Sequence, residues 1–321
     1  MIDIVIPNYN GNKYLKECID SLYIQTYSNF RVIIIDNAST DSNYKWLDKY
    51  ENIVFKRLDR NYGFDKAVNE GIKLSNTEYV VLLNNDTVAR KYWLENLIKC
   101  IKSDDKIFSV CSKMIRYDDK NIIDDAGDEY NALGWGYKIG DGQPITSHID
   151  TKEVFSSCAG AAIYRRSVLD EIGYFDEQFF AYMEDIDISY RAKIYGYKNI
   201  YCADAHIYHI GSATSGSKYN AFKVKLAARN NVYVPYKNMP IIQLIINLPF
   251  LILGFLVKYL FFIKKGFGTE YINGFIEGLQ TLNKVSKVKF KFKNIVNYIN
   301  IEYELLVNTI KYVLIKLKLI R

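Results

Sequence analysis

Three carboxylates lie within four residues at the start of a predicted helix, directly after an aromatic cluster. They are Glu184, Asp185 and Asp187, preceded by Phe179, Phe180 and Tyr182. A carboxylate set among aromatic rings is costly unless it binds a metal, pairs with a cation or accepts a proton. Acids in a first helical turn stabilise a helix by roughly 0.3–1 kcal/mol each. Because three such acids repel one another, helix stabilisation does not account for all of them, and one is the leading candidate for a general base.

Polar residues also follow three predicted strands at their carboxyl ends. The segments are Pro7-Asn8-Tyr9-Asn10, Asp36-Asn37-Ala38-Ser39 and Asn84-Asn85-Asp86-Thr87. Any one of them alone could be an ordinary turn or helix cap. In an open parallel sheet, however, ligands bind outside the carboxyl ends of the strands. Three such segments therefore predict one polar crevice.

The glycine pattern restricts how this crevice could hold a ligand. A dinucleotide fold would place GxGxxG after the first strand, where the chain has only Gly11, and a GxxxxGK[ST] loop is absent from the sequence. A diphosphate would then need another counter-charge. A divalent cation, Mg²⁺ or Mn²⁺, bound by Asp86 could supply it, since both ions prefer carboxylate and phosphate oxygens. Asp36 could accept a hydrogen bond from the N–H of a uracil or thymine ring.

Alternating strand and helix patterns would position these residues. Short runs rich in Ile and Val predict strands at 2–7, 30–36, 53–58, 79–84 and 107–111, with helical patterns at 12–25, 41–50, 63–74 and 91–102. This alternation predicts an α/β fold with a mostly parallel sheet flanked by helices. Residues 117–150 are polar and rich in glycine, which is typical of a functional loop.

The C-terminal quarter differs from the rest in charge and hydropathy. Residues 237–321 hold 13 Lys and Arg against 4 Asp and Glu, and Asn238–Val257 contains no charge over 20 residues. That length suits a membrane span, but its prolines and amides favour helices that lie in one leaflet. The alternative is a core helix of a small helical domain. Basic residues interleaved with aliphatic runs favour an anionic membrane surface over nucleic acid.

Domain organisation and cellular location follow from the same features. We expect a catalytic domain at 1–236 and a basic, apolar, membrane-associating helical region at 237–321. The five cysteines are widely spaced without a CxxC pair, which fits a reducing compartment. An apolar strand follows Met1 directly, which leaves no room for a signal peptide. We therefore expect the protein at the cytoplasmic face of the cell membrane.

Six ordered segments carry a resemblance to a known family. They are IVIPNYNG, VIIIDNASTDSN, NYGFDKAVNEGI, LLNNDT, CAGAAIYRRSVLDEIGYFDEQFFAYMEDIDISYRAKIYGY and AHIYHIGSATSG. Over roughly residues 1–235 the chain resembles family 2 glycosyltransferases with the GT-A fold, nearest to the rhamnosyltransferase and galactofuranosyltransferase-like branch. Relatives often end in membrane-associating helices, and the C-terminal region matches them only in that general sense.

The resemblance implies a role for individual residues. The nucleotide would be bound by Pro7, Tyr9, Asp36, Ser39, Asn61, Gly63, Asn69 and Asn85. Asp86 takes the last position of the family's DxD-type motif and would bind the metal, with His209 as a further ligand. The first position of that motif is Asn84 in place of Asp, which leaves one carboxylate. Asp185 matches the catalytic base, and Glu184 would support it or orient the acceptor.

These roles imply an inverting, metal-dependent transfer of a sugar from a UDP- or dTDP-type donor to a hydroxyl of a glycan or lipid-linked acceptor, in the synthesis of cell-surface polysaccharide or glycoconjugate. Trp135 and Tyr137 would face the acceptor, because aromatic faces stack on sugar rings. Arg229 and Asn230 could contact the diphosphate. Two alternatives are a sugar-nucleotide pyrophosphorylase, which would need a glycine-rich basic loop after the first strand, and a non-catalytic nucleotide-binding membrane scaffold.

Overall fold

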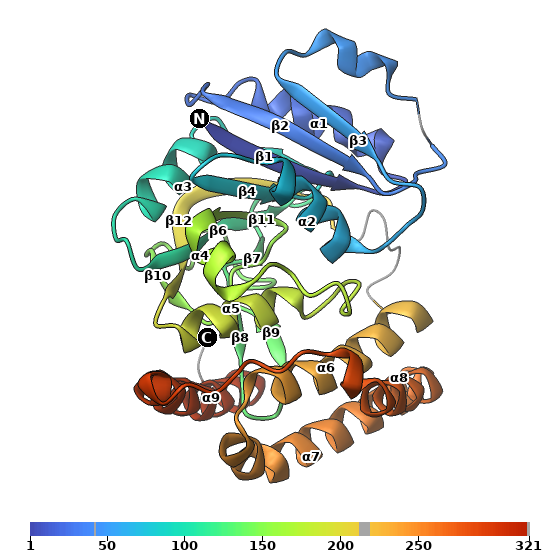
Figure 1. Ribbon diagram of the computed structural model, residues 1–321, viewed down its shortest axis with the longest axis vertical. Coiled ribbons are helices and arrows are strands. Elements are labelled where there is room, and N and C mark those ends of the chain that lie inside the picture. The colour runs from blue at the N-terminus through green and yellow to red at the C-terminus, as the bar shows by residue number, and fades with distance from the viewer. Residues whose placement is uncertain (42, 212–218, 320–321) are drawn as a thin grey trace.

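A central sheet with helices on both faces forms the upper part of the molecule in Figure 1. The computed structural model describes residues 1–41, 43–211 and 219–319. The end of the motif AHIYHIGSATSG therefore lies outside the described residues. The strands that run in one direction are β1 (Ile2–Asn8), β2 (Phe30–Asp36), β3 (Ile53–Arg57), β4 (Tyr79–Leu83), β6 (Ile107–Arg116) and β12 (Lys198–His209).

The strand order confirms the predicted mostly parallel sheet. It is β10-β12-β6-β11-β4-β1-β2-β3, where β10 (Lys152–Val154) and β11 (Ala161–Arg165) are antiparallel to their neighbours. Two short strands pair with the C-terminal parts of interior strands, β5 (Thr87–Ala89) with β12 and β7 (Ile123–Asp125) with β6. A separate hairpin is formed by β8 (Asp128–Tyr130) and β9 (Gly136–Lys138). Strands β7 to β9 lie in the segment predicted as a long loop.

Successive side chains of each strand point to opposite faces of the sheet, so the core has two layers. In β1, Ile4 and Ile6 pack into the layer under α1 (Asn12–Leu22) and α3 (Trp93–Ile101), whereas Val5 packs into the opposite layer. That second layer is covered by α2 (Phe64–Leu74), α4 (Arg166–Ile172) and α5 (Glu184–Ile194). The predicted helix at 41–50 is only a 3₁₀ turn, Lys45–Lys49.

Four helices form a second body against α5 and the β8–β9 hairpin (Figure 1). They are α6 (Ala221–Asn238), α7 (Ile241–Lys264), α8 (Gly268–Gln280) and α9 (Ile295–Lys316). Short 3₁₀ turns at Leu282–Lys284 and Phe292–Asn294 precede α9. A domain boundary at residue 236 would fall inside α6, which crosses from the part that contains the sheet into the helical layer.

Helix α7 turns its polar side inward and its apolar side outward. Gln243 Nε2 and Asn247 Nδ2 donate hydrogen bonds of 2.8 and 2.7 Å to Glu302 Oε2 on α9. Gly254 packs against the Leu133 carbonyl, where an added Cβ would lie 2.1 Å from the oxygen. Within the described chain, α7 is the one helix long and apolar enough to cross a membrane, and 17% of its most apolar window is buried. Its apolar surface is therefore not part of a protein core.

Candidate active site

The carboxyl ends of β1, β2 and β4 meet through one side chain. Asn8 Nδ2 lies 3.3 Å from both Asp36 Oδ1 and Ser39 Oγ. Asn8 Oδ1 accepts a 2.5 Å hydrogen bond from Asn85 Nδ2. The structure therefore brings together Asp36, Ser39 and Asn85, as the sequence predicted. Asn8, which was not among the predicted ligand-binding residues, is the group that connects them.

Asp36 is fixed by further partners before any ligand binds. The Tyr44 hydroxyl donates a 2.7 Å hydrogen bond to Asp36 Oδ1, and Arg57 Nε lies 3.5 Å from Asp36 Oδ2. Pro7 and Tyr9 flank Asn8 and are partly exposed. The predicted nucleotide-binding residues of β1 and β2 thus lie on one partly open edge of the sheet.

The segment before α2 crosses the loop that leads to α5. Gly63 has φ +88°, and a Cβ there would lie 2.3 Å from the Phe180 carbonyl oxygen. Asn61 Oδ1 accepts hydrogen bonds from Gly63 N and Asn37 Nδ2, both 2.9 Å. Asn69 is turned away from this edge, because its amide donates to Phe175 O at 2.8 Å and accepts from Phe175 N at 3.1 Å. Asn61 and Gly63 join the site, whereas Asn69 anchors the Phe175 loop.

His209, at the end of β12, faces Asp86 after β4. Its Nε2 lies 3.6 Å from Asp86 Oδ1, and its Nδ1 lies 2.8 Å from Asp124 Oδ2. Lys138 Nζ lies 2.9 Å from the same Asp124 oxygen. Burial alone would lower the pKa of His209, but the hydrogen bond to Asp124 and the charge of Asp86 outweigh it and raise the pKa to about 9. The two predicted metal ligands therefore lie together, with Asp124 as an unpredicted partner.

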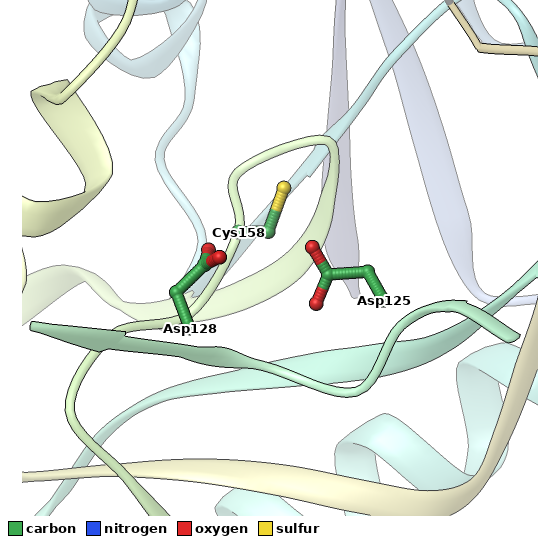
Figure 2. Close-up of side chains that lie close together, drawn as sticks. All are labelled: Asp125, Asp128 and Cys158. Atoms are coloured by element: carbon green, nitrogen blue, oxygen red, sulfur yellow. The ribbon is translucent and has the colours of Figure 1, made fainter. Parts of the chain in front are cut away.

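A second cluster of acids begins at Asp125, which lies 3.8 Å from the same Lys138 Nζ that contacts Asp124. Figure 2 shows this cluster. Asp125 of β7, Asp128 of β8 and Cys158 point toward one another, and one potential ligand atom from each lies within 4.8 Å of the others. Burial raises the pKa of Asp125 to about 6 and raises the pKa of the Cys158 thiol. Sequence reasoning missed these residues, although three acids in the five-residue run from Asp124 to Asp128 were a usable signal.

The start of α5 is preceded by strained backbone. Phe180, Tyr182 and Met183 have φ of 66°, 69° and 70°, which is rare for residues other than glycine. Asn230 Nδ2, buried on α6, lies 3.0 Å from the Phe179 carbonyl oxygen and 2.7 Å from that of Tyr182.

Arg229 Nη2 reaches the same loop, with hydrogen bonds of 2.9 and 2.8 Å to the carbonyl oxygens of Gln178 and Phe179. The expected contact of Arg229 and Asn230 with a diphosphate is therefore replaced by contacts with the loop. Together the two side chains hold in place the loop that precedes Asp185 and the start of α5.

The three acids of α5 have different environments. Glu184 and Asp187 are 8% and 1% exposed, whereas Asp185 is partly exposed. Burial, followed by repulsion from neighbouring carboxylates, raises the pKa of both Glu184 and Asp185 well above the usual range. Asp185 Oδ1 accepts a 3.0 Å hydrogen bond from Ala159 N, so its position is fixed. Of the three, Asp185 combines access to solvent with high basicity.

Asp187 has a structural position. Its carboxylate lies 3.0 Å from Arg191 Nη2 and 3.0 Å from Lys237 Nζ, and it accepts a 2.9 Å hydrogen bond from Asn238 Nδ2. Burial would raise the pKa of Asp187, but the charges of Lys237 and Arg191 outweigh it and lower the pKa. Asp187 therefore joins α5 to α6, in agreement with a helix-stabilising role.

Asp187→Asn is expected to lower the free energy of unfolding by about 3–5 kcal/mol at pH 7, because buried Arg191 loses its counter-charge and Lys237 keeps only Asp176. A lowered folded-state pKa gives stability that is present above the unfolded value of about 3.9 and is lost as the pH falls below it. The difference between wild type and variant, measured by urea denaturation, should shrink below about pH 4. Asp170→Asn removes a more exposed pair and should cost at most about 1 kcal/mol. Equal effects of the two variants would contradict this role.

Trp135 and Tyr137 lie against the C-terminal helix. Their rings contact Tyr312 of α9 at centroid distances of 5.4 and 5.0 Å, and Tyr137 OH donates a 3.1 Å hydrogen bond to Asn308 O. Trp135 is 8% exposed. Both residues are part of the β8–β9 hairpin and pack against the helical layer, and their contact with an acceptor stays a prediction.

Known proteins are similar to this chain in sequence and in fold. A family model described as "Glycosyl transferase family 2" matches residues 3–173, more than half of the chain. Glycosyltransferase GlyG of Streptococcus pneumoniae is 28% identical over 33% of this chain, and the match spans 36% of GlyG. The O-antigen chain rhamnosyltransferase WbaN of Salmonella anatum is 28% identical over 68% of this chain and 69% of WbaN.

A solved structure of GalNAc-T7 with UDP, GalNAc and Mn²⁺ aligns with a TM-score of 0.60 at 16% identity, over 73% of this chain and 47% of that one. This likeness is one of fold, and it agrees with the mostly parallel sheet and its flanking helices. The expected GT-A fold is confirmed. With the family match over residues 3–173, these findings establish that the chain belongs to glycosyl transferase family 2.

Proposed function

We propose that the protein is an inverting, metal-dependent glycosyltransferase that moves a sugar from a UDP- or dTDP-type donor to a hydroxyl of a glycan or lipid-linked acceptor. The contacts of Ala159 and Gly160 are the main support for this proposal. Asn84, two residues before the proposed metal ligand Asp86, donates a 2.8 Å hydrogen bond from its backbone N–H to Gly160 O. The backbone N–H of Ala159, the residue before Gly160, donates to Asp185 Oδ1. The loop that would bind the metal and the donor, and the side chain that would act as the base, are therefore held by the adjacent residues Gly160 and Ala159.

The metal fits the pair of Asp86 and His209 better than the second cluster. Asp124 holds His209 Nδ1, which directs Nε2 toward Asp86, an arrangement typical of metal-binding histidines. A thiol is a poor ligand for Mg²⁺ or Mn²⁺, and Cys158 is part of the second cluster. GalNAc-T7, a protein of the same fold, was solved with UDP and Mn²⁺. When bound, the ion would offset the negative charge that grows on the departing diphosphate.

Each residue of the site would then have a separate role in the reaction. Asp36 and Ser39, fixed through Asn8, would bind the nucleotide base and ribose. Asp185 would remove the proton from the acceptor hydroxyl as its oxygen attacks the anomeric carbon from the face opposite the nucleotide. Glu184, the adjacent buried acid, would support the base or orient the acceptor.

Donor use is the first test. We expect nucleotide release from a panel of UDP- and dTDP-sugars in the presence of Mn²⁺, and none after chelation with EDTA. Binding of a sugar nucleotide without release, measured by calorimetry in the presence of candidate acceptors, would instead favour the scaffold alternative. Formation of sugar nucleotide from a sugar phosphate and a nucleoside triphosphate would favour the pyrophosphorylase.

Asp124→Asn tests the metal assignment independently of turnover. The variant should weaken Mn²⁺ affinity by about 10- to 100-fold, because outer partners of this kind tune a metal-bound histidine. Electron paramagnetic resonance of free Mn²⁺ during titration measures this directly. Asp141→Asn, an exposed acid paired with Arg116, is the matched control and should leave affinity unchanged. Unaltered binding by Asp124→Asn would remove His209 from the metal site.

The membrane is the proposed location of the acceptor. The outward face of α7 exposes Ile241, Ile242, Ile245, Leu253, Leu256 and Leu260, and Lys264 and Lys265 follow at its end. Apolar residues beside cations suit the interface of an anionic bilayer, and we place this face at the cytoplasmic leaflet. Because α7 packs along α8 and is hydrogen-bonded to Glu302 of α9, a position in one leaflet is favoured over a span. Sedimentation with phosphatidylglycerol vesicles, stronger than with phosphatidylcholine vesicles, is the expected result.

A further inference from the structure

A cavity of about 250 Å³ lies between α6, α7, α8 and the loop of the β8–β9 hairpin. Its wall is almost entirely hydrocarbon and includes Val232, Leu251, Phe255 and Phe275. Leu248 also lines it and is 49% exposed, so the cavity opens at the surface of α7. An apolar chain could pass into it from a bilayer without crossing water.

The side chain of Lys258 lies at one end of this cavity, beside Trp135. Leu248, Leu251, Phe255 and Lys258 follow one another at spacings of three or four residues and share a face of α7. Lys258 Nζ lies 5.4 Å from the centroid of the Trp135 ring, which also lines the cavity. No carboxylate of the described residues lies within ion-pair distance of Lys258. A lysine without a counter-charge beside a hydrocarbon wall is complementary to a phosphate group.

The hairpin connects the cavity to the catalytic base. Trp135 is followed by Gly136, where an added Cβ would lie 3.3 Å from Ile186 Cγ1, next to Asp185 on α5. The other strand of the hairpin begins at Asp128, whose pKa is raised by burial and then by the charges of Asp125 and Asp185. The cavity and the base are therefore on two sides of the same small hairpin.

We propose that this cavity binds the hydrocarbon chain of an acceptor sugar linked to a lipid through phosphate, with Lys258 at the phosphate and the acceptor hydroxyl on the sugar. The proposal rests on the proposed function, which it deepens by naming the acceptor class. A sugar or nucleotide would leave its polar groups unpaired against such a wall, whereas a hydrocarbon chain would not. The opening beside the bilayer-facing residues of α7 provides the route of entry.

Direct binding of farnesyl phosphate to the full chain, measured by calorimetry below the concentration at which the lipid aggregates, tests the proposal. Leu248→Trp should fill the mouth and weaken binding about tenfold or more. Leu253→Trp is the matched control, since Leu253 is also on α7 and 53% exposed but does not line the cavity. Ile252→Trp, a second lining position, should behave as Leu248→Trp does. Equal binding by the lining variants and the control, or no binding by wild type, would overturn the proposal.

Further measurements distinguish lipid binding in the cavity from binding at the bilayer surface and from binding in the donor site. Lys258→Met should abolish the preference for farnesyl phosphate over farnesol, while inorganic phosphate alone should not bind. Leu248→Trp should keep wild-type binding to phosphatidylglycerol vesicles, and a parallel loss there would assign the effect to the surface and contradict the proposal. Binding of UDP-sugars by the same variant should be unchanged, so a failure of donor use is seen separately from a failure of lipid binding.

Discussion

Asp185→Asn is expected to lower kcat by about 10²–10⁴-fold, the usual contribution of a positioned general base. The amide has nearly the shape of the carboxylate and can keep the hydrogen bond from Ala159 N, so donor affinity should stay within about twofold of wild type. Because burial raises the pKa of Asp185, wild-type kcat/KM should rise with pH until this group is deprotonated. The variant should lack that rise. Initial rates of nucleotide release across pH, with calorimetry for donor affinity, measure both effects.

The control for this prediction is Asp170→Asn, which alters an exposed carboxylate and should leave the rate and its pH profile unchanged. A circular dichroism melt of each variant excludes unfolding as the cause of a lower rate. If Asp185→Asn retained near wild-type kcat, or kept the same rise with pH, Asp185 would not be the base. Glu184→Gln would then be the next variant to test, since Glu184 is the adjacent buried acid.

Asp86→Ala is expected to have the second-largest effect, with a loss of about 10²–10³-fold in kcat, comparable to removal of a main electrostatic contact in a transition state. Asp86 is the only carboxylate of its motif, because Asn84 stands at the first position. Mn²⁺ affinity and donor affinity should both fall, and a higher Mn²⁺ concentration should restore part of the rate.

Asp105→Ala, at a fully exposed acid, is the matched control and should change neither affinity nor rate. Electron paramagnetic resonance of free Mn²⁺ and nucleotide release together distinguish loss of metal from loss of catalysis. An Asp86→Ala protein with wild-type Mn²⁺ affinity would move the metal to another group. The cluster of Asp125, Asp128 and Cys158 would then be the alternative position.

The repeating pattern of strands and helices made the fold predictable from sequence. Each strand of the parallel half is a short apolar run followed by a turn signal, and the structure places these runs in one sheet. The polar segments after β1, β2 and β4 met as predicted, because strands that run in one direction end at the same edge. The residues placed correctly are those whose position depends on strand direction alone.

What sequence could not predict depends on contacts between distant segments. Asp124 lies 85 residues from His209, and nothing in the local pattern near either residue indicates the other. The pKa directions of Glu184 and Asp187 are opposite although both are buried in the same helical turn, because the cations Arg191 and Lys237 reach only Asp187. Such differences arise from packing and cannot be inferred from composition or spacing.

The anomeric configuration of the product tests the central claim most directly. A single displacement with Asp185 as base on the acceptor side predicts that the transferred sugar has the configuration opposite to that of the donor. Proton NMR of the product, taken before spontaneous anomerisation of any released sugar, gives the answer from the coupling of the anomeric proton. A retained configuration would require either two successive displacements or attack from the face of the departing nucleotide, and would contradict the mechanism proposed for this site.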